Sequence, residues 1–409
     1  MSASLSRLAT SSRWHLRVSY SCRHSSGVRS LSTHTTPKVI ISKHIEGRKD
    51  PGITVFSGIQ PTGIPHLGNY LGALRQWRDL QNSDTEVTPV FCIVDLHALT
   101  TVNPQEAAVL RQRKRETLAS LLAAGLDPEK SIIYFQSSLQ YHAELMWILS
   151  CNASMGYLTR MTQWKSKMEL PDDAELTTSS PGKQLKLGLF SYPVLQAADI
   201  LLHQADIVPV GADQRQHIEF TRELAKGFNN IYKDEKTYGD VFKLPKIHIP
   251  PTARIMSLTD PVEKMSKSHP KESSRIELTD SSDAIRRKLQ KSVTDSIEGI
   301  SYDPDVRPGI SNLIDILYTL GHPDLGSSKG PEGLVPILST LSKLELKRTV
   351  ADAIDTELRP IREKYVNIMK EDKQDSGFLD NIAVTGMERA KKRAKSTMDV
   401  VRLALGYGH

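Results

Sequence analysis

The chain has 409 residues, of which 39% are hydrophobic and 24% are charged, so it is long enough to bury one or two globular cores. Fibrous and wholly disordered chains are excluded, and no run approaches the ~20 apolar residues that a membrane-spanning helix needs. The three cysteines, Cys22, Cys92 and Cys151, are too few for a disulfide framework or a four-ligand zinc site. We expect a protein of a reducing compartment with no metal bound by its side chains.

The net charge of +6 is concentrated in residues 1–45. This segment holds seven of the 53 lysines and arginines, twelve serines and no acidic residue, so the remaining 46 basic and 47 acidic residues nearly balance. An Arg- and Ser-rich leader without acids is typical of an organelle transit peptide. A disordered basic arm that binds RNA is the alternative. We expect this leader to direct import and to lie outside the fold.

Apolar runs and helical patterns alternate along residues 46–270, which we expect to form one domain. Short strands are predicted at residues 53–58, 90–94, 132–135 and 207–210. Helices are predicted at residues 65–77, 103–125 and 213–228. Strands separated by helices imply an α/β fold with a doubly wound, Rossmann-like parallel sheet.

Helical patterns without strands follow from residue 271, so residues 271–409 are predicted to form a helical C-terminal domain. Its helices are predicted at residues 281–291, 311–320, 344–369 and 381–405. The last of these carries a basic cluster of Arg389, Lys391, Lys392, Arg393 and Lys395. Helical spacing predicts a face that contacts RNA phosphates, with a solvated helix face as the alternative. Residues 169–182 and 321–332 are predicted to be loops.

Two clusters of candidate ligand-binding residues follow predicted strands. SGIQPTG at residues 57–63, with HLGN at 66–69, combines glycines that let the backbone approach a ligand with a helix start that attracts an anion. VPVGADQ at residues 208–214 places Asp213 and backbone N–H groups at the sheet edge, where a ribose could bind. Each also has a structural reading, as a capped turn and as a helix N-cap.

A third cluster, KMSKS at residues 264–268, has two lysines three residues apart with two hydroxyls. This arrangement suits a mobile loop that binds a polyphosphate while pyrophosphate leaves. A solvated basic loop is the alternative, although a given pentapeptide arises by chance in such a chain with odds of about one in ten thousand.

In this order, about two hundred residues apart, HLGN and KMSKS resemble the signature elements of the class I aminoacyl-tRNA synthetases. The finer resemblance is to the tryptophanyl type of bacteria and mitochondria, and it extends from Phe56 almost to the C-terminus. The matching segments are FSGIQPTG at 56–63, FCIVDLHALT at 91–100, MTQWK at 161–165, YPVLQAADILL at 192–202, VPVGADQRQH at 208–217, RIMSL at 254–258 and TDSIEGISYD at 294–303.

The resemblance implies a role for each matching residue. His66, Asn69, Lys264 and Lys267 would be catalytic, with Lys167 as a further candidate near the triphosphate. The ATP site would comprise Gln60, Pro61, Thr62, Gly68, Asn69, Gly211, Ala212, Asp213, Ile255, Lys264, Met265, Ser266, Lys267 and Ser268. The tryptophan pocket would comprise Phe56, His97, Tyr192, Gln196, Asp199 and Gln214, with Asp199 accepting the indole N–H. Family members usually differ at Ala212 and often at Gln196 and His66.

The implied reaction activates L-tryptophan with ATP and Mg²⁺ to tryptophanyl-adenylate and pyrophosphate, then transfers tryptophan to the 3′ end of mitochondrial tRNA(Trp). The implied location is the mitochondrial matrix, and the implied assembly is a homodimer. The alternatives are a tyrosyl-type synthetase, a small-molecule nucleotidyltransferase, and a non-catalytic protein that binds RNA and assists intron folding. The chain lacks the GxxxxGK[ST] loop of P-loop NTPases.

Overall fold

The computed structural model describes residues 52–100, 107–175, 184–249, 254–267, 269–321, 330–375 and 377–407. The predicted leader, the predicted helix start at residues 103–104 and Ser268 lie outside the described residues, as do parts of both predicted loops. Residues 51–409 form one compact unit. No helix in the described ranges is long and apolar enough to cross a membrane.

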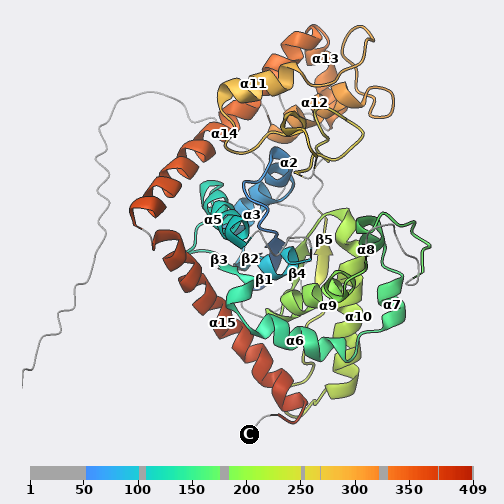
Figure 1. Ribbon diagram of the computed structural model, residues 1–409, viewed down its shortest axis with the longest axis vertical. Coiled ribbons are helices and arrows are strands. Elements are labelled where there is room, and N and C mark those ends of the chain that lie inside the picture. Colours follow the sequence, from blue (N-terminus) through green and yellow to red (C-terminus); the bar gives the residue numbers. More distant parts are fainter. Residues whose placement is uncertain are drawn as a thin grey trace, which may run out of the picture. The chain divides into compact units, whose positions relative to one another are not determined.

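A sheet of five parallel strands in the order β3-β2-β1-β4-β5 forms the centre of this unit (Figure 1). The strands are β1 (Ile53–Ile59), β2 (Val87–Ile93), β3 (Ile132–Phe135), β4 (Ile207–Pro209) and β5 (Lys246–His248). The first four confirm the predicted strands and the parallel α/β fold, whereas β5 was not predicted. The strand order reverses between β1 and β4, and ligands of doubly wound sheets bind at such a switch point.

Both faces of the sheet are buried, as the continuous apolar runs predict. Along β2, Phe91 and Ile93 belong to one hydrophobic core and Val90 and Cys92 to the other. The elements that precede residue 233 are α2 (Leu67–Asn69), a π-helical turn η1 (Tyr70–Leu74), α3 (Arg75–Gln81), α4 (Asp95–Ala98), α5 (Ala107–Ala123), η3 (Gln136–Ser138), α6 (Tyr141–Ser150), α7 (Met155–Thr159), α8 (Thr162–Lys167), α9 (Leu187–Leu202), η4 (Ala212–Gln214) and α10 (Arg215–Tyr232).

Helices dominate the chain after β5, which confirms the helical C-terminal region. The elements are η5 (Glu272–Ser274), α11 (Ser282–Gln290), α12 (Pro308–Leu320), η7 (Pro331–Leu334), α13 (Val335–Leu338), α14 (Lys343–Gln374) and α15 (Phe378–Ala404). Helix α14 starts at a capping box between Ser342 and Glu345, and α12 ends at Gly321, whose φ of 70° suits a residue without a side chain.

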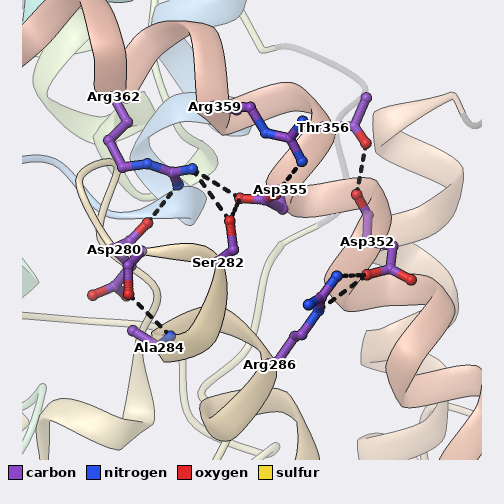
Figure 2. A network of polar contacts seen from close by, with 10 residues as sticks. Asp280, Ser282, Ala284, Arg286, Asp352, Asp355, Thr356, Arg359 and Arg362 are labelled. Atoms are coloured by element: carbon purple, nitrogen blue, oxygen red, sulfur yellow. Dashed lines mark hydrogen bonds and ion pairs between the residues drawn. The ribbon is translucent and has the colours of Figure 1, made fainter.

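A buried carboxylate joins α11 to α14 (Figure 2). Asp355 on α14 accepts hydrogen bonds from Ser282 at 2.8 Å, Arg359 at 2.6 Å and Arg362 at 3.0 Å. Arg362 also donates to the carbonyl of Asp280 at 2.6 Å, so the start of α11 is fixed to the middle of α14. Burial opposes ionisation of Asp355, but these donors outweigh it and lower its pKa to about 2.

The last helix, α15, returns to the sheet and packs against the edge strand β3. Arg389 donates to the carbonyls of Pro128 and Ser131, and Arg393 donates to Thr54 at the start of β1. Two arginines of the predicted basic cluster thus bond to the fold, because spacing alone does not show which side of a helix packs inward. Lys391, Lys392 and Lys395 are exposed.

Candidate active site

The turn after β1 forms the first wall of the site. Gly63 has a φ of +86°, which favours glycine, and its carbonyl accepts a hydrogen bond from Thr117 on α5 at 3.2 Å. Gln60 and Thr62 are exposed on the turn, and Pro61 is buried. Ser57 on β1 donates to the carbonyl of Pro209 on β4 at 3.1 Å, so the two strands are tied together where the sheet order reverses.

His66 and Asn69 form the start of the next helix. Asn69 N–H donates to His66 Nδ1 at 3.3 Å, and His66 N–H donates to Asn69 Oδ1 at 3.2 Å. Burial, together with Lys267, Lys264 and Arg275, lowers the pKa of His66 to about 3. The imidazole is therefore neutral at physiological pH, and because Nδ1 accepts a bond, its N–H is on Nε2. Gly68 packs closely on this ring, where a Cβ atom would lie 3.1 Å from it.

The HLGN segment pairs with a segment near the C-terminal helices. Leu67 N–H donates to the carbonyl of Ile276 at 2.8 Å, and Leu278 N–H donates to the carbonyl of Pro65 at 3.0 Å. Glu277 lies between these bonds, three residues before the Asp280 carbonyl that Arg362 holds. His66 is thus connected to α14 through these backbone hydrogen bonds and the bond from the Arg362 side chain.

The KMSKS segment folds back on the RIMSL segment. Ser257 N–H donates to the carbonyl of Glu263 at 2.8 Å, and Met265 N–H donates to the carbonyl of Ile255 at 3.1 Å. Ile255 and Met265 are buried, whereas Lys264 is exposed and Ser266 is half-buried. Asn312 on α12 bonds both the N–H and the carbonyl of Met256, which fixes this hairpin to the helical region.

Lys267 brings the first and third clusters together. Its Nζ donates to the carbonyl of Thr62 at 3.1 Å, although 205 residues separate the two in sequence. Burial lowers the pKa of Lys267 to about 8; Glu277 opposes this shift and Arg275 adds to it. A partly desolvated ammonium next to a glycine-containing turn is well placed to neutralise a polyphosphate.

The loop after β4 forms the opposite wall of the site. A Cβ atom on Gly211 would lie 2.6 Å from Asp213 Oδ1, so a side chain there would have to displace the Asp213 carboxylate. The Asp213 carboxylate is exposed and accepts from Gln214 at 2.9 Å, while the Asp213 carbonyl accepts from Gln163 on α8 at 2.8 Å. Ala212 belongs to the same helical turn.

Polar side chains from α9 and α10 meet beside this loop. Gln196 donates to Gln214 at 3.2 Å, and the Tyr192 hydroxyl lies 3.0 Å from Gln163 Oε1 and 3.1 Å from His217 Nε2. Burial raises the pKa of Tyr192, and it lowers the pKa of His217 to about 4. Lys167 Nζ lies 4.7 Å from the centre of the Tyr192 ring, a cation–π arrangement.

Asp199 is the most completely bonded acid of the site. Its Oδ1 accepts from Gln136 and from His142 Nδ1, both at 2.7 Å, and its Oδ2 lies 2.9 Å from His97 Nε2. Burial favours the neutral acid, but the bonds from His142 and His97 outweigh burial and hold the pKa of Asp199 well below its usual range. The carboxylate is ionised, and Oδ2 retains acceptor capacity for one more donor.

The sequence patterns missed Gln136 and His142. Gln136 is the first residue after β3, at the carboxyl end of a predicted strand, so its place in the chain could have marked it. Its Oε1 accepts from Leu96 N–H at 3.1 Å, which turns its amide N–H₂ toward Asp199. His142 lies on α6, which was not predicted, and nothing in the local sequence marks it. Phe56 completes this part of the site and stacks on His203, with ring centres 5.6 Å apart.

Comparisons with known proteins identify the family. A family model described as tRNA synthetases class I (W and Y) matches residues 48–359. The chain belongs to this family. The mitochondrial tryptophan–tRNA ligase of Schizosaccharomyces pombe is 43% identical over 364 residues, which cover 87% of this chain and 96% of that protein.

Solved structures of this family share the fold. The crystal structure of tryptophanyl-tRNA synthetase from Mycoplasma pneumoniae has a TM-score of 0.73 at 33% identity and covers 87% of this chain and 98% of that one. The enzyme from Campylobacter jejuni, complexed with ADP and tryptophan, has a TM-score of 0.67 at 29% identity and covers 87% and 100%. Membership in the family accounts for the parallel sheet and the helical C-terminal region.

Proposed function

We propose that this chain is a tryptophan–tRNA ligase. The carboxylate of tryptophan attacks the α-phosphorus of ATP, pyrophosphate leaves, and the activated tryptophan is transferred to the 3′ end of tRNA(Trp). The contact between Lys267 and the Thr62 carbonyl is the observation that supports the first step. It brings together two segments that are both suited to phosphate binding. Charge neutralisation and positioning supply most of the catalysis in such a reaction, so no protein nucleophile is needed.

ATP binds between the two walls of the site. Lys264 and Lys267 neutralise the triphosphate, the N–H on His66 Nε2 donates to a phosphate or ribose oxygen, and the loop at residues 211–213 holds the ribose. Buried Ile255 contributes apolar surface toward the adenine. Because the pKa of His66 is about 3, this imidazole donates as a neutral group and does not act as an acid.

Mg²⁺ accompanies ATP in this proposal. In the parts of the chain that the structure describes, no group of three or more His, Cys, Asp or Glu side chains could hold a metal ion. The donor set therefore fits an ion held by phosphate oxygens, with the lysines beside it, better than an ion held by the protein.

Tryptophan binds against Phe56, His97 and Tyr192. The free acceptor position on Asp199 Oδ2 accepts the indole N–H, and Gln196, Gln214 and Tyr192 surround the α-amino group. A buried acceptor left without a donor costs free energy, so this pocket rejects side chains that lack an N–H or O–H at that position.

The remaining proposals concern partners and location. Exposed Lys391, Lys392 and Lys395 on α15 contact tRNA phosphates. Helix α9 contacts both α6 and α7, and these three helices expose Trp147, Met155 and Leu187, of which Trp147 is 73% exposed, so this surface forms a homodimer interface. With the mitochondrial naming of the yeast relative, the composition of residues 1–45 supports import into the mitochondrial matrix.

Pyrophosphate exchange tests the proposal. The purified protein, ATP, Mg²⁺ and labelled pyrophosphate should give exchange that depends on tryptophan, and aminoacylation should follow when tRNA(Trp) is added. Exchange driven by tyrosine would assign a tyrosyl-type enzyme instead. RNA binding without exchange by either amino acid would favour the non-catalytic alternative.

A further inference from the structure

We propose that Tyr134 and His203 are positioning residues, which keep Nε2 of His142 free of a proton and fix the orientation of its ring, and thereby hold Asp199 in place for tryptophan. The inference rests on the proposed role of Asp199 as the acceptor for the indole N–H. It adds that a chain of buried side chains behind the pocket sets the specificity of that acceptor.

The chain of hydrogen bonds joins β3, α6 and the end of α9. His142 Nδ1 lies 2.7 Å from Asp199 Oδ1, and His142 Nε2 lies 2.9 Å from the Tyr134 hydroxyl. The same hydroxyl lies 2.7 Å from His203 Nε2. His142, Tyr134 and His203 are each at most 1% exposed, so donors and acceptors within the chain must match without help from bulk water.

Proton counting gives the bonds a direction. The ionised Asp199 can only accept, so His142 Nδ1 carries a hydrogen. Burial lowers the pKa of His203 well below its ordinary value and raises the pKa of Tyr134 well above it, so His203 is neutral and the phenol keeps its proton. A neutral His142 has a bare Nε2, to which Tyr134 donates, and the Tyr134 oxygen then accepts from His203 Nε2–H. Every donor points toward Asp199.

The far end of the chain supports this direction. Among the described residues, His203 Nδ1 is buried and has no hydrogen-bond partner. With the proposed direction of the hydrogen bonds, this nitrogen carries no hydrogen and only a lone pair is left without a partner. The opposite direction would leave a buried N–H without a partner on His203 and put a cation on His142, and both are costly in a protein interior.

Removal of the Tyr134 hydroxyl should release His142. With no donor at Nε2, this nitrogen can take up a second proton, and the ring loses the bond that fixes its orientation. The carboxylate then loses the fixed orientation of one of its three donors. ATP, which binds elsewhere in the site, should be unaffected.

The kinetic test compares Tyr134→Phe with Tyr302→Phe. The control also deletes a hydroxyl that donates to a partner, in this case to Asp315 at 3.0 Å in the C-terminal region. In pyrophosphate exchange, Tyr134→Phe should raise the KM for tryptophan about tenfold and leave the KM for ATP unchanged, since the lost bond acts on a charged acceptor. An unchanged tryptophan KM, or an equal rise for ATP, would overturn the proposal.

The spectroscopic test reads the proton directly. In protein labelled with ¹⁵N-histidine, the signals of His142 are assigned by their loss in His142→Gln. The wild type should show a neutral imidazole protonated at Nδ1, and Tyr134→Phe should show a larger share of imidazolium, because Nε2 no longer accepts a bond. A wild-type imidazolium, or protonation at Nε2, would refute the proposed direction even if the variant fails to fold. Wild-type protein with this tautomer but without tryptophan-dependent exchange would contradict the proposed function alone.

Discussion

Lys267 has a pKa close to the pH at which enzymes work, because its ammonium is partly shielded from water. In the free enzyme it loses its proton near pH 8, so kcat/KM for ATP in pyrophosphate exchange should fall as the pH rises through about 8. Bound phosphates favour the charged form, so kcat should decline only at higher pH. In Lys267→Arg the cation persists, and the alkaline limb of kcat/KM should disappear. If kcat/KM of this variant still declines at high pH, the decline belongs to another group.

Unfolding caused by deprotonation of Lys267 does not explain a decline in kcat/KM at high pH. The pKa of Lys267 falls from 10.5 to about 8 on folding, so between these values the unfolded chain binds more protons than the folded one. The contribution of this group to stability therefore rises with pH across that window. Thermal melts at pH 7 and pH 9 separate lost activity from lost fold.

Replacement of Lys267 tests the role of its side chain in the transition state. Lys267→Ala should slow adenylate formation by roughly 10²–10³, the loss typical of one preorganised donor, and should leave tryptophan binding nearly unchanged. Rapid-quench measurement of adenylate gives the rate. Lys271→Ala is the control, because Lys271 is exposed and follows the same segment. A wild-type rate in Lys267→Ala would remove this residue from the site.

Asp199 should determine which amino acid is accepted. Asp199→Asn keeps the size of the side chain but replaces an ionised acceptor with a neutral amide. We expect the KM for tryptophan to rise by roughly 10–150-fold, as for a lost bond to a charged group, while the KM for ATP changes little. Pyrophosphate exchange measures both. Equal changes for the two substrates would mean that Asp199 serves the fold.

The residues that the sequence predicts for the site are those in contiguous motifs. His66, Lys267 and Asp213 stand in segments whose composition marks them, and the structure places the first two beside one turn. Gln136 and His142 act on Asp199 from separate elements; only the place of Gln136 after a predicted strand could have marked it, and nothing in the neighbourhood of His142 distinguishes that residue. A contact such as that between Lys267 and Thr62 depends on tertiary packing, so only the resemblance to a family predicted that these clusters meet.

At the scale of elements, strongly periodic segments were predictable and short or irregular ones were not. Four strands and all four C-terminal helices follow from apolar periodicity, and α5 ends beside its predicted stop, Gly125, whose φ is +103°. Strand β5 has only three residues, and the π-helical turn η1, in which Tyr70 and Leu74 are buried, interrupts the predicted helix at residues 65–77. Patterns also failed to show which charged residues of α15 face inward, because Arg389 and Arg393 bond to the fold from the same basic cluster whose lysines are exposed.

Gly386 marks the closest approach of α15 to the sheet. A Cβ atom there would lie 1.8 Å from the carbonyl oxygen of Ile133 on β3, so Gly386→Ala must displace backbone. We expect it to destabilise the protein by about 1–3 kcal/mol or more. Gly227→Ala on α10 is the control: its Cβ atom meets nothing within 4 Å, so it should be neutral or stabilising. Urea titrations compare the two, and equal midpoints would contradict the packing.

The exposed lysines Lys391 and Lys392 of α15 are candidates for contact with RNA, whereas Lys395 pairs with Asp399 at 2.6 Å. Lys391→Glu combined with Lys392→Glu should raise the KM for tRNA several-fold, more at low salt, and leave tryptophan-dependent pyrophosphate exchange unchanged. Arg389→Glu, in contrast, should lower the melting temperature, since Arg389 bonds the backbone at Pro128 and Ser131. A tRNA KM that the lysine variant leaves unchanged would mean that these side chains are only solvated.

At the scale of the whole molecule, the leader and the folded unit should have separable roles. Deletion of residues 1–45 should leave aminoacylation intact and keep the protein in the cytosol, because these residues hold the excess positive charge and none of the site residues. Cell fractionation and an aminoacylation assay measure the two effects. Import that survives the deletion would place the targeting signal elsewhere.

Because the C-terminal helix α15 packs against the sheet, the chain cannot complete its fold until its C-terminal end has been delivered. Arg393 bonds Thr54, 339 residues earlier, so β1 lacks this partner until nearly the whole chain has passed a ribosome or an import channel. Contacts so distant in sequence form slowly, and the edge of β3 stays open to aggregation in the meantime. Imported chains should therefore need chaperones until residues 378–404 emerge. A chain stalled before that point should be degraded instead of accumulating as a partly active enzyme.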